Sequence, residues 1–101
     1  MSKLDDMLQQ MLDEAKARDK VPQKRKLGNG LHITLTAYRE SVILAISRDT
    51  TFPSEQEWKT VCNHFPYYIG VPMPIKFTDN DHRMAMRAEV PSRQFVAQKL
   101  L

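Results

Sequence analysis

Residues 31–48 read LHITLTAYRESVILAISR, and this stretch decides the fold. Apolar and polar side chains alternate strictly over residues 31–38, which predicts a β-strand with one buried face. Residues 41–48 are apolar at positions that point to both faces, as is typical of a central strand. Arg39-Glu40 is short enough for a tight turn between the two. The stretch therefore predicts an antiparallel hairpin inside a larger sheet.

A helix and a second hairpin are predicted after it. Residues 54–57, SEQE, form a capping box, in which the serine and the last glutamate satisfy amides of the first helical turn. Residues 75–78 and 82–90 predict two short strands around the turn Asp79-Asn80-Asp81. Residues 93–101 predict a last helix. The apolar face expected for the helix over residues 54–65 consists of Trp58, Val61, Cys62 and Phe65.

The N-terminal segment predicts an amphipathic helix over residues 1–20. Its apolar stripe has helical spacing, and Pro22 ends it. Residues 21–30 combine Lys24-Arg25-Lys26 with Gly28-Asn29-Gly30, which predicts a basic linker. We therefore expect three parts: a helix (1–20), a linker (21–30) and an α+β domain (31–101). The stripe consists of Leu4, Leu8, Met11 and Ala15.

The predicted fold is α+β, with the element order α-β-β-α-β-β-α. Two hairpins separated by a helix most simply form one four-stranded antiparallel sheet, with the Trp58 helix on one face. The tethered N-terminal helix is then left to cover the other face, to cap a sheet edge or to bind another chain. The pattern does not choose among these positions.

The length, composition and net charge of the chain limit the classes of protein to which it can belong. The chain has 101 residues, 42% of them hydrophobic, and a formal net charge of +3, which fits one folded domain. It has a single cysteine, so no intrachain disulfide can form. There is no signal-peptide-like run and no apolar stretch of membrane-spanning length. We therefore expect a cytoplasmic protein without a membrane segment.

No catalytic, metal-binding or cofactor-binding motif stands out. Cys62 and His64 have no second Cys/His pair to complete a tetrahedral site. The chain contains no Gly-x-Ser-x-Gly, and Gly28-Asn29-Gly30 precedes a strand and not a helix, so it reads as a turn. We therefore expect a protein that is not an enzyme and that holds no metal or cofactor.

Two sets of residues predict binding. The first set is apolar: Leu4, Leu8 and Met11 on the N-terminal helix, with Tyr67 and Tyr68 in an apolar loop. Because two heptads are too short for a stable isolated coiled coil, the helix must bury its stripe somewhere. The leading hypothesis is a small interaction module that binds a protein partner or a second copy, as in a homodimer, through this helix or the sheet face.

The second set is basic and gives the alternative, a nucleic-acid-binding module. A flexible basic segment and a basic sheet face together would follow the phosphates of a nucleic acid. The residues of this set are Lys24, Arg25, Lys26, Arg83 and Arg87.

One stretch has a family resemblance. Residues 44–48, LAISR, lead through Pro53-Ser54 to a helix that contains Glu57-Trp58. Over residues 42–65 this arrangement resembles small uncharacterised proteins of bacterial and phage genomes. The resemblance implies a bacterial or phage source and no particular activity.

Overall fold

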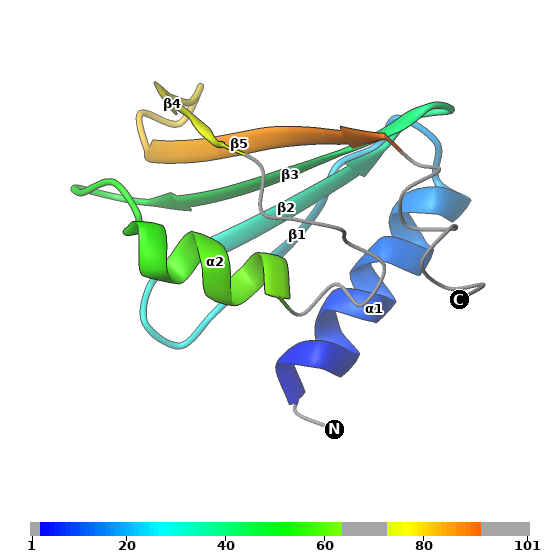
Figure 1. The fold of residues 1–101 in the computed structure, drawn as a ribbon, viewed down its shortest axis with the longest axis horizontal. Coiled ribbons are helices and arrows are strands. Elements are labelled where there is room, and N and C mark those ends of the chain that lie inside the picture. The colour runs from blue at the N-terminus through cyan, green and yellow to red at the C-terminus, as the bar shows by residue number, and fades with distance from the viewer. Residues whose placement is uncertain (1–2, 64–72, 92–101) are drawn as a thin grey trace.

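The computed structural model describes residues 3–63 and 73–91, which form two helices and a five-stranded sheet (Figure 1). The predicted α+β class is confirmed. The elements in chain order are α1 (Lys3–Ala17), β1 (Gln23–Lys26), β2 (His32–Ala37), β3 (Ser41–Arg48), α2 (Glu55–Asn63), β4 (Ile75–Thr78) and β5 (Met84–Pro91).

The sheet is antiparallel throughout, with strand order β1-β2-β3-β5-β4. The predicted hairpin of residues 31–48 is β2–β3, and β3 is the central strand because β2 and β5 pair with its two sides. The register sets Ile46 of β3 between Ile33 of β2 and Met86 of β5. All three side chains are buried, so the apolar face of β3 is the middle of the core.

Both described helices lie on the same face of the sheet (Figure 1). α1 contacts β1 and β2, and α2 lies beside it beneath the sheet. The core fills the space between the helices and the strands. The helical residues buried in it are Leu8, Met11, Leu12 and Ala15 of α1 and Trp58, Val61 and Cys62 of α2.

The predicted linker over residues 21–30 is wrong in its centre, where Gln23–Lys26 forms β1. The sheet therefore has five strands instead of the predicted four. The sequence QKRK has no apolar alternation, so its strand conformation depends on pairing with β2. Arg25 adds an ion pair to Glu14 of α1, with Nη2 and Oε2 2.6 Å apart. The expected linker is thus part of the sheet.

α1 is held directly against the chain's own sheet. Lys20 adopts φ 69°, a left-handed conformation that reverses the chain after the helix. Its N–H then donates to the carbonyl of Ala37 at 2.9 Å. The sequence left the position of this helix open, and the structure places it on the face that α2 also covers.

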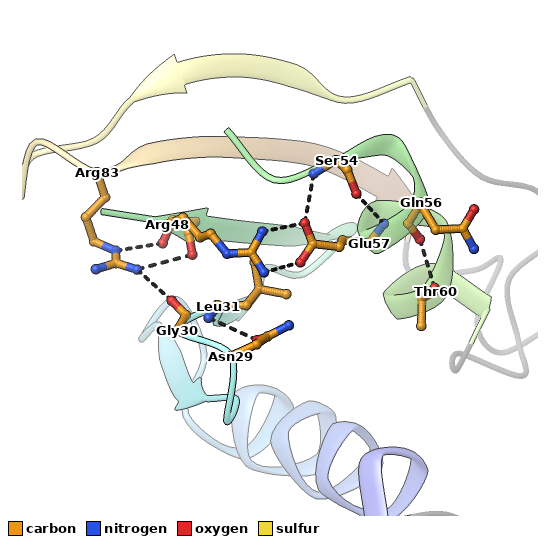
Figure 2. Close-up of polar contacts among 10 residues, drawn as sticks. Asn29, Gly30, Leu31, Arg48, Ser54, Gln56, Glu57, Thr60 and Arg83 are labelled. Carbon is orange, nitrogen blue, oxygen red and sulfur yellow. Dashed lines mark hydrogen bonds and ion pairs between the residues drawn. The ribbon is translucent and has the colours of Figure 1, made fainter. Parts of the chain in front are cut away.

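The predicted capping box at α2 is confirmed. The N–H of Glu57 donates to Ser54 Oγ at 3.1 Å, and the N–H of Ser54 donates to the Glu57 carboxylate at 3.0 Å. Arg48, at the end of β3, donates to both oxygens of the same carboxylate (Figure 2). These Arg48 hydrogen bonds hold the pKa of Glu57 below its usual value. The end of the central strand is thereby joined to the start of α2.

Three predictions lie outside the described residues: the helix over 93–101, the end of the Trp58 helix at Phe65, and the loop of Tyr67 and Tyr68. In the part of the chain that the structure describes, neither helix combines the length and hydrophobicity that a membrane span needs.

Candidate nucleic-acid interface

The apolar stripe of α1 is used inside the molecule. Leu8 and Met11 are fully buried against the sheet, so neither offers a surface to a partner in this structure. The side chain of Leu4, with Tyr67 and Tyr68, lies outside the described part. The described part of the α1 stripe is therefore not available to a partner in this structure.

The sheet has a second face that neither α1 nor α2 covers (Figure 1). We call it the open face. Alternation along each strand assigns its residues, because successive side chains point to opposite sides. They are Lys24 and Lys26 of β1, His32, Thr34 and Thr36 of β2, Ile43, Ala45 and Ser47 of β3, Ile75 and Phe77 of β4, and Ala85, Arg87 and Glu89 of β5.

The register arranges these residues in rows across the strands. One row runs Lys26, His32, Ser47, Ala85, Phe77, and the next runs Lys24, Thr34, Ala45, Arg87, Ile75. The middle of both rows consists of small or hydroxyl side chains. Charged or large side chains stand at the two sides, on β1 and on β4–β5. Over these two rows the middle of the open face is formed by small side chains, with basic residues on β1 and β5 and uncharged residues at the β4 edge. The third row, Thr36, Ile43 and Glu89, adds an apolar side chain and an acid.

Alternation also divides the basic segment of β1. Lys24 and Lys26 are exposed on the open face. Arg25 points to the other side, where it pairs with Glu14. Of the five basic residues predicted to bind a polyanion, Arg25 is therefore engaged with the helix layer instead.

Arg83 has a structural role. Its Nε donates to Ser47 Oγ at 3.0 Å, and its Nη2 donates to the carbonyls of Ser47 and Gly30 at 3.2 and 3.3 Å (Figure 2). Its Nη1 forms an ion pair with Asp49. The side chain is only 12% exposed. Arg83 thus ties the start of β5 to the end of β3 and to the loop before β2, although its positive charge still acts on the open face.

His32 lies in a positive electrostatic environment on that face. Burial, and then the charges of Arg83, Lys26 and Lys24, lower the pKa of His32 below its ordinary value, against a smaller opposing effect of Asp49. Neutral imidazole is therefore favoured at neutral pH. An anion bound here would be attracted by the charges that disfavour the imidazolium.

The open face is hollowed toward one end. A hollow of about 520 Å³ lies among Tyr38, Ser41, Ile43 and Glu89, and a second of about 160 Å³ lies between Ile43 and Arg87. Because Ile43 and Glu89 line both, the hollows adjoin. Beside the second, the guanidinium of Arg87 stacks over the Phe77 ring, 4.9 Å from its centroid.

The described residues contain no cluster of the kind that binds a metal ion. Nowhere in 3–63 or 73–91 do three or more His, Cys, Asp or Glu side chains gather as metal ligands would. Cys62 is buried beneath the sheet, and burial raises the pKa of its thiol to about 12, so it is not a thiolate nucleophile. What this part of the chain provides is a surface.

The sequence predicted Lys24, Lys26 and Arg87 on this surface, with His32 on the same face, but not the exposure of Phe77 on it or the hollows. The signal for them was the alternation in residues 31–38 and 75–78, read together with a register that the sequence does not contain. No family model matches the chain. No curated protein matches it, and no solved structure does. The interface therefore rests on the geometry of this chain alone.

Proposed function

We propose that the protein is a small binding module whose open face binds single-stranded nucleic acid. One observation carries the proposal: the register brings Lys24 and Lys26 of the edge strand β1 and Arg87 of β5 to one sheet face that no described helix covers. Phosphates bind to such basic residues through salt-dependent electrostatic attraction.

The centre of the face suits bases. Ala45 is partly exposed, and its small side chain lets a planar ring approach the sheet, while its partner Thr34, also partly exposed, carries a hydroxyl group. Ala85 and Ser47 lie beside them but are buried, at 2% and 9% exposure. Phe77, at the β4 side, supplies an aromatic ring for stacking. From β1 to β4 the face spans four strand spacings, roughly 19 Å in all. This is room for a short single strand laid across the sheet.

Charge is distributed unequally between the layers of the molecule. α1, with Arg25 paired to Glu14, carries three basic residues against four acids, and α2, with Arg48 paired to Glu57, carries two basic residues against two acids. The open face with its Arg83–Asp49 pair carries four basic residues against two acids. A polyanion is therefore attracted more strongly to the sheet side than to the helix side. Among the described residues, no helix or ribbon protrudes from this face to enter a duplex groove, which favours a single strand.

The test is a fluorescence anisotropy titration of a labelled single-stranded oligonucleotide at several salt concentrations. The variant replaces Lys24, Lys26 and Arg87 by glutamine. Three lost phosphate contacts are expected to reduce the salt slope by about 2, so that between 50 and 200 mM salt the wild type loses roughly 20-fold more affinity than the variant.

A matched control removes the same charge elsewhere. Lys16, Arg18 and Lys59 are exposed and lie away from the open face, and their triple replacement by glutamine is expected to keep nearly the full salt slope. Equal slopes in the two triple variants would refute the open face as the interface, and absence of wild-type binding at low salt would refute the function.

His32 provides an independent prediction. Its free pKa should lie below 6.5 by NMR titration, and a bound oligonucleotide should raise it, because phosphates offset the charges of Arg83, Lys26 and Lys24. The folded state binds the His32 proton less tightly than the unfolded state does. His32 therefore contributes to stability above about pH 6.5, the pKa of an unfolded histidine, and this contribution is lost as the pH falls through the lower pKa of the folded state. An unchanged His32 pKa on saturation would place the ligand elsewhere.

We retain protein association as a second candidate function, now through the sheet and not through α1. Ile75, with 61% of its surface exposed, favours it, together with Tyr38 and Ile43 in the lining of the hollows.

A further inference from the structure

β4 ends the sheet, and no other described strand pairs with its outer side. The N–H of Asp79 donates to the carbonyl of Arg83 at 3.0 Å, which continues the β4–β5 register. In an antiparallel pair, successive residues direct their N–H and C=O groups alternately to the two sides. Phe77 therefore directs these groups to β5, and Lys76 and Thr78 direct theirs outward. The outer side of β4 is a row of hydrogen-bonding groups ready for another strand.

The two edges of the sheet differ in their protection. β1 has the sequence QKRK, and three like charges oppose the pairing of this edge with a copy of itself. β4 has the sequence IKFT, with one charge. Ile75 is 61% exposed, and Met73, just before the strand, is 85% exposed. The exposed and weakly charged edge is β4.

We infer that β4 pairs antiparallel with β4 of a second copy of this chain, about a two-fold axis at Phe77. For both open faces to lie on the same side of the joined sheet, residues whose side chains point to the same face must stand opposite each other. Centring on Lys76 would oppose two like charges directly, which is unfavourable. Centring on Phe77 sets Lys76 opposite Thr78 of the second copy, so that both strands use their outward N–H and C=O groups.

The same register pairs the two aromatic rings. Phe77 would face Phe77 of the second copy at a position without backbone hydrogen bonds, where opposing side chains are closest. The two sheets would join into one continuous sheet with both open faces on the same side. The inference does not depend on what the open face binds, and its failure leaves the proposed function intact.

The experiment measures molar mass by light scattering and sedimentation over a concentration series reaching about 1 mM, because so short an interface is expected to be weak. For the wild type we expect mass rising toward twice the 11.7 kDa of one chain. Lys76→Pro removes an outward N–H that makes no hydrogen bond to any other described residue, so this variant should fold and remain monomeric.

Lys76→Ala is the matched control. It loses the charge and the contact of Nζ with the Phe52 ring, 5.6 Å from the centroid, but keeps the N–H. Its association should equal or exceed that of the wild type. A wild type that stays monomeric at about 1 mM overturns the inference, and so does a dimer that survives in Lys76→Pro with native circular dichroism.

Discussion

Replacing Leu12 by alanine is expected to lower the free energy of unfolding by about 2–5 kcal/mol. Leu12 lies on α1, is only 1% exposed and belongs to the core cluster between the helices and the sheet. The substitution removes buried apolar surface and leaves a cavity that the neighbours fill incompletely. Since a domain of this size has a total stability of about 5–15 kcal/mol, much of the folded state's margin would be lost.

Urea denaturation followed by circular dichroism measures the effect, and Lys16→Ala is its control. Lys16 is on the same helix but exposed, so its replacement should change stability by no more than about 0.5 kcal/mol. If Leu12→Ala were as mild as Lys16→Ala, α1 would not be part of the core, and its stripe would again be available to a partner.

Replacing Arg83 by alanine is expected to lower the free energy of unfolding by about 1.5–3 kcal/mol, more than the same replacement of an ordinary surface arginine would. The loss follows from its contacts with Ser47, Gly30 and Asp49, which join three segments far apart in the sequence. Arg83→Lys should recover only part of the stability, because a lysine ammonium cannot span acceptors that a planar guanidinium reaches together.

Arg87→Ala is the comparison that separates stability from binding. Arg87 lies on the same face of β5, four residues away, but is exposed. Its loss should leave the urea midpoint nearly unchanged and weaken oligonucleotide binding. The prediction for Arg83 fails if both alanine variants unfold at the wild-type urea concentration.

Much of the fold follows from local patterns. Alternation over residues 31–38 and the apolar run of 41–48 predicted the β2–β3 hairpin, and the capping box predicted the start of α2, because each signal lies within a few neighbouring residues. β1 was not predictable in this way. QKRK has no alternation, and its conformation comes from its pairing with residues 32–35 and from the ion pair to Glu14.

The face that a helix covers is likewise not a local property. The stripe of α1 required burial, but its spacing is the same whether the helix packs on its own sheet or elsewhere. The basic residues show the same limit. Arg83 and Arg87 are equivalent by spacing. Only the three-dimensional structure, which sets Arg83 beside Asp49 and Gly30, makes Arg83 a buried link between segments and leaves Arg87 exposed over the Phe77 ring.

The strand order has a consequence for folding during synthesis. β1, β2 and β3 pair in chain order, so they can assemble as soon as they leave the ribosome. β3 must then wait for β5, whose first paired residue, Met84, follows Arg48 by 36 positions. At ribosomal speeds of about 5–20 residues per second, this interval is roughly 2–7 s. During this interval one side of β3, the most apolar strand of the described sheet, has no partner strand. The nascent chain therefore most needs protection from aggregation at this stage.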